Sequence, residues 1–284
     1  MRKPTPAAVS CLQIQTPMSS RGRHTAALLL VGLTLPSLSA GQADVDSLTA
    51  QATAGAPNAQ FELAGLYARG EGGLEQDLAV AADWFRSSAS QGHADAQLTI
   101  GVYYLLGQGV AQDHEEAVRW FRLAGDQDNV FALNNLGVIY QGVPEPFQVD
   151  QPIRLDHSAS VRFFRRAAEL GHGVSAINLG VKYRDGDGVD RNPAEAFRWY
   201  FHAAQLGEVT ALGEVGAMYA AGNGVEQDDV EAYHWLELAT LHMAGGDREV
   251  LLLDREMVAE RLTAAEIAEA ERRAERWVPT RAGR

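Results

Sequence analysis

Residues 175–207 read SAINLGVKYRDGDGVDRNPAEAFRWYFHAAQLG, and this stretch decides the fold because its pattern returns along the chain. In it, Trp199 follows Asn192 by seven residues. Five such pairs of a capping residue and an aromatic ring occur: Asp77/Trp84, Asp113/Trp120, Asp156/Phe163, Asn192/Trp199 and Asp228/Trp235. Successive rings are 36, 43, 36 and 36 residues apart. A fixed period in this range is typical of a solenoid of stacked repeats.

The first half of each period predicts a helix that ends at a glycine turn. In the fourth unit, Gly180 precedes Tyr183 by three residues, and Gly186 and Gly188 follow. A Gly inside a helix costs about 1 kcal/mol relative to Ala, so a very small residue at this position in all five units indicates a close approach between helices. Gly tolerates the left-handed conformation, and the Gly-x-Gly pair therefore predicts the end of the first helix.

The second half of each period predicts another helix. Asn192 fits an N-cap, whose side-chain oxygen accepts hydrogen bonds from the first free amides, and Pro193 fits the first helical position. The apolar positions follow the i, i+3, i+4, i+7 spacing of one helix face: Ala196, Trp199, Tyr200 and Ala203. Each unit is thus predicted to be a helical hairpin of roughly 36 residues.

These residues resemble the SEL-one-like repeat (SLR) family, which is related to the tetratricopeptide repeat. The fourth unit carries the family pattern almost throughout, at Gly180, Tyr183, Gly186, Gly188, Val189, Asn192, Ala196, Trp199, Ala203, Ala204 and Gly207. The resemblance covers residues 55–243 and implies an all-α, right-handed α-α superhelix of five hairpins. Residues 244–284 are then expected to form C-terminal capping helices and a tail, with a capping box at Thr263 and Glu266 and a polar outer face.

Residues 1–43 have the features of a secretory signal, with Met18 as a candidate true start. Arg21 and Arg23 precede a ten-residue apolar run, which is too short for a transmembrane helix of about 20 residues. Cleavage after Ala43, with Ala40 and Ser39 as alternative positions, would give a periplasmic or secreted protein without stable membrane insertion. The alternative is a hydrophobic helix packed on the solenoid. Cys11 is the only cysteine, so the mature chain would have no disulfide.

The charge balance bears on the kind of partner. The chain has a formal net charge of −13, and residues 1–43 contain four basic and no acidic residues. The mature chain is therefore more acidic still, which opposes binding to nucleic acid or anionic lipid.

No catalytic, cofactor or metal motif stands out. The eight His are scattered, with His93 and His172 at the loops between repeats. Tight ligand pairs for zinc and phosphate-binding glycine loops with Lys are absent from the sequence. We therefore expect a non-enzymatic scaffold that binds a protein or peptide in the bacterial cell envelope. The alternative is an envelope enzyme acting on peptidoglycan fragments or β-lactams, but relatives linked to β-lactam hydrolysis rely on Cys-stapled repeats, which this chain lacks.

Two candidate binding elements follow from the repeat register. First helices line the inner surface of related solenoids, and polar residues on two of them could bracket a peptide backbone or meet a carboxylate: Asn134, Asn135, Asn178, Lys182 and Arg184. The alternative is a solvated helix face. The third unit also carries an insertion, residues 141–156, with Pro residues and Phe147. That loop either makes the specific contact or folds back on its own repeat.

Overall fold

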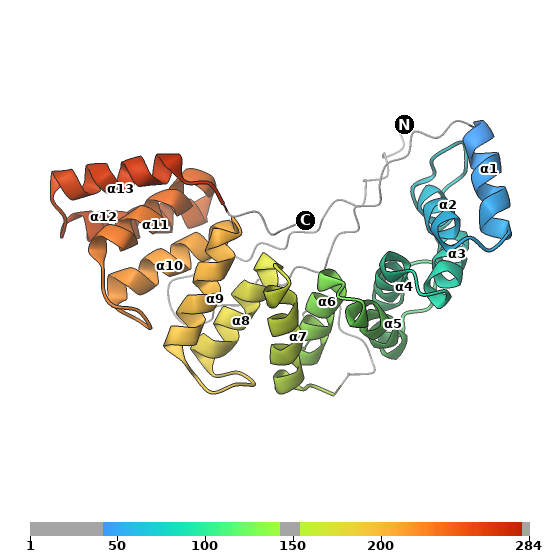
Figure 1. The fold of residues 1–284 in the computed structure, drawn as a ribbon, viewed down its shortest axis with the longest axis horizontal. Coiled ribbons are helices and arrows are strands. Elements are labelled where there is room, and N and C mark those ends of the chain that lie inside the picture. Colours follow the sequence, from blue (N-terminus) through green and yellow to red (C-terminus); the bar gives the residue numbers. More distant parts are fainter. Residues whose placement is uncertain (1–41, 143–153, 280–284) are drawn as a thin grey trace, which may run out of the picture. The chain divides into compact units, whose positions relative to one another are not determined.

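The computed structural model describes residues 42–142 and 154–279, which form helices joined by turns and, within these ranges, no strand (Figure 1). The all-α repeat fold is confirmed. The described residues fall into two compact units, one ending at Asp156 and the other beginning at His157. We call these the N-terminal and C-terminal units and describe each by itself.

The N-terminal unit contains helices α1 (Gln42–Thr53), α2 (Pro57–Arg69), α3 (Leu78–Ser90), α4 (Ala94–Leu106), α5 (His114–Asp126) and α6 (Val130–Gln141). The C-terminal unit contains α7 (His157–Glu169), α8 (Gly173–Asp185), α9 (Pro193–Gln205), α10 (Val209–Ala221), α11 (Asp229–His242), α12 (Gly246–Ala259) and α13 (Ala264–Arg276). The hairpins α2–α3, α4–α5, α8–α9 and α10–α11 lie where the period places them, and the third repeat contributes α6 to one unit and α7 to the other.

Helix α1 precedes the first repeat and was not expected from the sequence. It packs on α2, and its Val45 is only 2% exposed. A Cβ atom built on Gly72 would lie 2.7 Å from Val45 Cγ2, so α1 covers the turn of the first repeat. Few of its side chains are apolar and buried, so it gives little periodic signal.

The core of each repeat is built on the residue that follows the signature aromatic. These residues are almost fully buried: Phe85, Phe121, Phe164, Tyr200 and Leu236. A Cβ on Gly101 would lie 2.7 Å from the Phe121 ring, and one on Gly180 would lie 2.9 Å from the Tyr200 ring. The small residue of the first helix therefore makes room for this ring, which explains why it recurs.

The second glycine of the Gly-x-Gly turn contacts the preceding repeat. Gly109 has φ +65°, and a Cβ there would lie 2.0 Å from the carbonyl oxygen of Leu78, the first residue of α3. Gly188 meets His157 and Gly224 meets Pro193 in the same way. Because the nearest atoms are backbone, only glycine fits at this junction between repeats.

Arginine–tyrosine hydrogen bonds also link successive repeats. Arg86 of α3 donates to the hydroxyl of Tyr104 on α4 at 3.4 Å, and Arg165 of α7 donates to Tyr183 on α8 at 2.6 Å. Arg122 of α5 makes the equivalent bond to Tyr140 of α6. The repeated Tyr thus serves the interface with the repeat before it.

The predicted helix caps are confirmed where the structure shows them. Four second helices begin at a side chain that accepts backbone hydrogen bonds: Asp77, Asp113, Asn192 and Asp228. His93 and His172, which the sequence places between repeats, have the same role for α4 and α8, because their Nδ1 atoms accept the amides of Ala96 and Ser175 at 3.2 Å. The scattered histidines therefore include structural caps.

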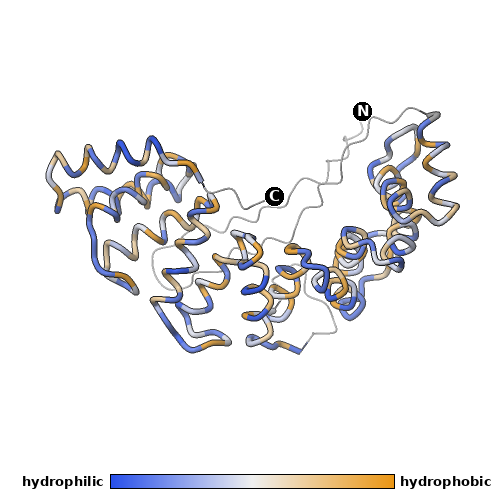
Figure 2. The backbone as a smooth tube through the Cα atoms, viewed as in Figure 1, coloured by the Kyte–Doolittle hydropathy of each residue, from blue (hydrophilic) through white to orange (hydrophobic). Residues whose placement is uncertain are grey.

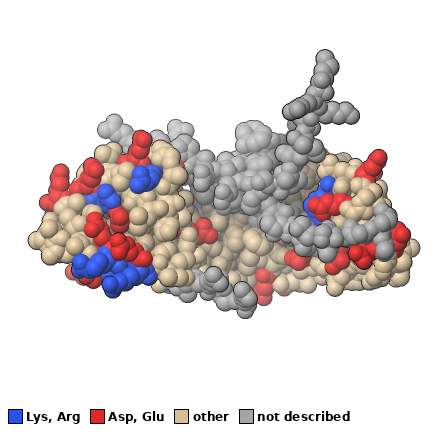
Figure 3. Space-filling model, turned by 90° about the horizontal axis from the view of Figure 1, so that it is seen from above, with Lys and Arg blue, Asp and Glu red and all other residues tan. Residues whose placement is uncertain are grey.

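Helices α12 and α13 both pack on α11. The capping box of Thr263 and Glu266 is present, and α13 is largely hydrophilic (Figure 2), with acidic and basic side chains over the C-terminal helices (Figure 3). The outer side of α12 departs from the expected polar surface, because Leu253 and Met257 are 62% and 57% exposed. Leu253 and Met257 are one helical turn apart, on the side of α12 opposite the buried Leu251 and Val258.

Candidate functional site

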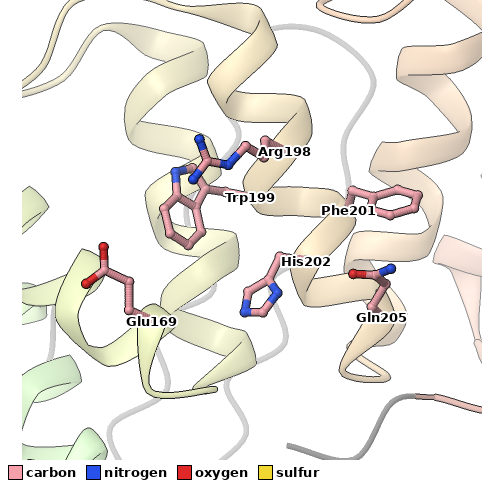
Figure 4. A pocket seen from close by; sticks show the side chains of 6 residues that line it. All are labelled: Glu169, Arg198, Trp199, Phe201, His202 and Gln205. Carbon is pink, nitrogen blue, oxygen red and sulfur yellow. The ribbon is translucent and has the colours of Figure 1, made fainter.

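The C-terminal unit has a surface hollow of about 360 Å³ on its second helices (Figure 4). One lining residue, Glu169, ends α7, and the others lie on α9: Arg198, Trp199, Phe201, His202 and Gln205. Four of the α9 residues follow the i, i+3, i+4, i+7 spacing, so the helix presents them as one stripe. Glu169 stands across from Trp199 and His202 (Figure 4).

Trp199 and Arg198 form one wall of this hollow. Trp199 is 7% exposed, and the guanidinium carbon of Arg198 lies 5.4 Å from its ring centroid. Arg198 also donates to the Glu195 carboxylate at 3.1 Å, which offsets its charge. Glu116, Arg119 and Trp120 repeat this arrangement in the N-terminal unit, with the Arg 4.3 Å from the ring, so the stack belongs to the repeat.

His202 is held in a defined orientation. Its Nε2 lies 3.3 Å from the carbonyl oxygen of Ala168, and its ring meets Trp199 edge to face at 6.1 Å. A carbonyl oxygen can only accept, so Nε2 carries the proton in this contact and Nδ1 of the neutral ring remains an acceptor. The hollow thus contains an imidazole whose tautomer is set by the backbone of the preceding repeat.

An aromatic row continues from the hollow toward the C-terminal helices. Phe201 meets Trp235 of α11 at 5.3 Å, and Trp235 meets Trp277 at 6.4 Å. These contacts fix the Phe201 side of α9 against α11. Trp, Tyr and Arg are enriched at the energetically important positions of protein interfaces.

The residues predicted to bind on the first helices fall into two groups. Asn134 and Asn135 lie on α6 of the N-terminal unit, whereas Asn178, Lys182 and Arg184 lie on α8 of the C-terminal unit. The two groups thus belong to different compact units, and each group is described by itself. The first four are at most 3% exposed, so the expected accessible polar surface is not what the structure shows for them.

The two basic residues of this set already have acidic partners in the chain. Lys182 Nζ lies 2.5 Å from Asp187, which also contacts His157 Nδ1 at 2.7 Å. Burial opposes ionisation of Asp187, but the hydrogen bonds and charges of Lys182 and His157 outweigh it and lower the Asp187 pKa. Arg184 pairs with Asp185 at 2.8 Å. The Lys182–Asp187–His157 contacts join α8 to its turn and to α7, whereas Arg184 and Asp185 both lie on α8. A ligand role for the five residues stays a prediction.

The remaining expectations concern absences and the loop. Phe147 lies in 143–153, outside the described residues. Within residues 42–142 and 154–279, no group of three or more His, Cys, Asp or Glu is arranged to hold a metal ion. Within the same ranges, no helix combines the length and hydrophobicity needed to cross a membrane.

Sequence reasoning identified Trp199 as a repeat ring but did not bring it together with the other lining residues, such as Glu169 and His202, in a site. Glu169 belongs to the preceding repeat and is far in sequence from the α9 residues, so the sequence alone does not indicate that they are neighbours. The available signal was the stripe at 198, 201, 202 and 205, which mixes charged, aromatic and amide side chains where a solvated helix face would carry only polar ones.

Comparisons with known proteins agree with the repeat architecture. The chain is similar to a protective antigen of uropathogenic Escherichia coli with an SLR fold, at 27% identity and a TM-score of 0.64, over 85% of this chain and 53% of that one. It thus spans about half the length of that relative. A Sel1 repeat protein from Oxalobacter formigenes matches at 24% identity and a TM-score of 0.67, over 82% of this chain and 94% of that one.

A search of curated proteins found no match. The Sel1 repeat model, in contrast, matches five successive segments: residues 57–93, 94–129, 130–172, 173–208 and 210–241. These segments coincide with the helical hairpins and together cover more than half of the chain. The protein therefore belongs to the Sel1 repeat family.

Proposed function

We propose that this protein is a non-enzymatic scaffold that binds a protein partner, and that the hollow on α7 and α9 anchors that partner. Sel1 repeat proteins are typically protein-interaction scaffolds. The observation that carries the proposal is the composition of the hollow, in which a Trp–Arg stack, a Phe and an oriented His surround about 360 Å³ of accessible space. Trp and Arg are enriched among the few residues that supply most of the binding energy in protein interfaces.

The hollow is tested by affinity capture with the purified full chain and two variants. His202→Ala combined with Gln205→Ala removes two polar lining groups. Leu123→Ala is the matched control, because Leu123 follows Trp120 as His202 follows Trp199 and is 39% exposed in the N-terminal unit. We expect a partner retained by the wild type and by Leu123→Ala to be lost by the double variant. Equal capture by all three would show that the hollow does not anchor it.

We further propose export to the bacterial cell envelope. The support is the basic and apolar pattern of residues 21–35, together with the description of one structural relative as a protective antigen. Cleavage after Ala43 would retain Val45, the buried contact of α1. N-terminal sequencing of the protein from its native cell should begin near Asp44. A cytoplasmic form that keeps residues 18–40 would contradict export.

The non-enzymatic part of the proposal has its own test. Nitrocefin and muropeptides are incubated with the purified chain, and we expect no turnover of either substrate. Turnover that a single substitution in the chain abolishes would overturn the proposal of a non-enzymatic scaffold.

A further inference from the structure

The charge of the hollow favours a cationic group. Arg198 is the only basic residue with a permanent charge among the lining residues, and Glu195 pairs with it at 3.1 Å. Glu169 is exposed and has no ion-pair partner among the described residues. The lining residues and Glu195 therefore carry a formal charge of −1, on a chain whose formal net charge is −13. An anionic ligand would meet repulsion there.

The hydrogen-bonding groups of the hollow point to the same chemistry. His202 presents Nδ1 as an acceptor, because Nε2 donates to the Ala168 carbonyl at 3.3 Å. The Gln205 side chain is exposed and makes no hydrogen bond within the described residues, so its amide oxygen can also accept. With the Glu169 carboxylate, the hollow offers three acceptors beside aromatic rings, an arrangement suited to a planar group with several N–H donors.

We propose that the hollow binds an arginine side chain of the protein partner. The guanidinium would donate to Glu169 and to the acceptors of α9, and its stem would lie along the Trp199 and His202 rings. Arginine fits better than lysine because its guanidinium is flat, weakly hydrated and carries five donors, whereas an ammonium is a compact point charge. This proposal rests on the proposed protein-binding function and specifies the partner's chemistry.

The test titrates the purified full chain with N-acetyl-arginine amide, followed by NMR at the Gln205 side-chain amide and the His202 ring. N-acetyl-citrulline amide is the matched probe, since it replaces the charged guanidinium by a neutral urea of nearly the same shape. N-acetyl-lysine amide keeps the positive charge but lacks the planar guanidinium, so it separates the effect of the group's shape from that of its charge. Glu169→Gln removes the carboxylate charge, and Glu115→Gln, an exposed carboxylate on α5 in the N-terminal unit, is the matched control.

We expect the arginine probe to bind with a dissociation constant on the order of 1 mM and the citrulline and lysine probes to bind more weakly. Glu169→Gln should weaken arginine binding about three- to fivefold, the effect of one partly exposed ion pair, and Glu115→Gln should leave it unchanged. Equal binding of arginine and citrulline probes, or equal loss in the two Gln variants, would overturn the proposal.

The two proposals fail separately. If the affinity capture depends on His202 and Gln205 but the arginine probe does not bind, the hollow anchors a partner through another group. If the arginine probe binds as expected but no partner depends on the hollow, the chemistry of the site holds and the scaffold function is wrong.

Discussion

Replacing Gly109 with Ala tests whether the repeats are joined through the second turn glycine. Gly109 has φ +65°, a region that costs an L-residue about 1–2 kcal/mol. The new Cβ would also lie 2.0 Å from the Leu78 carbonyl oxygen and 2.9 Å from the Ala79 nitrogen. Because both contacts are backbone, the repeats must separate, and overpacking of this kind typically costs about 1–3 kcal/mol. We therefore expect a total loss of about 2–5 kcal/mol.

Gly92→Ala is the matched control for this prediction. Gly92 also has a positive φ, +91°, but nothing lies within 4 Å of its Cβ position, so this variant carries the backbone strain without the clash. Urea unfolding of the purified chain, followed by far-UV circular dichroism, compares the two midpoints. Gly109→Ala should unfold at clearly lower urea than Gly92→Ala. Equal shifts would refute the packing of Gly109 on α3 and its role at the repeat junction.

Three further predictions follow from the C-terminal unit. Trp199→Ala should reduce stability by about 3–5 kcal/mol, since the ring is 7% exposed, and an unchanged melting temperature would show that the repeat register is wrong. Tyr200→Phe should leave the stability unchanged or raise it by about 1–3 kcal/mol, because the buried Tyr200 hydroxyl has no hydrogen-bond partner among the described residues. Phe already occupies this position in the first three repeats. A clear loss of stability in thermal unfolding would indicate an unseen partner of the hydroxyl. Burial lowers the His172 pKa to about 4, so the unfolded chain binds a proton at this histidine more readily than the folded chain does. The contribution of His172 to the free energy of unfolding is therefore complete above pH 6.5 and falls by an amount on the order of 3 kcal/mol between pH 6.5 and 4. Below pH 4 this contribution does not change further. His172→Asn, which copies the Asn129 cap of α6, should flatten that part of the pH profile of urea unfolding, and an unaltered profile would assign it to other groups.

Much of the fold was predictable because the repeat multiplies each local signal. The caps at Asp113 and Asn192, the turn at Gly186 and the apolar stripe around Trp199 all have their predicted roles. Helix α1 was missed because its buried positions are few and no repeat supports it. The exposed Leu253 and Met257 were missed because the last helices have no following repeat from which their outer side could be inferred.

The candidate site was much less predictable than the fold. The register places Asn178 and Lys182 on a first helix, but only the structure shows that they are buried and that Asp187 pairs with Lys182. The hollow joins Glu169 to residues of α9 that lie about 30 positions further along the chain. The spacing of residues in the sequence predicts which side chains are neighbours on one helix, but this site depends on how two successive repeats pack together.

The most direct test of the central claim, that a partner docks on the hollow of α7 and α9, is site-specific photo-crosslinking with the full-length chain. A photoreactive benzoyl-phenylalanine is placed at Leu170, which follows Glu169 and is 43% exposed but does not line the hollow, with Glu115 as the control position, and the chain is irradiated in an extract of its native cell. We expect one discrete adduct from position 170, diminished by Glu169→Gln, and none from position 115. A folded chain that gives no adduct at 170, or the same adduct from both positions, would contradict the claim.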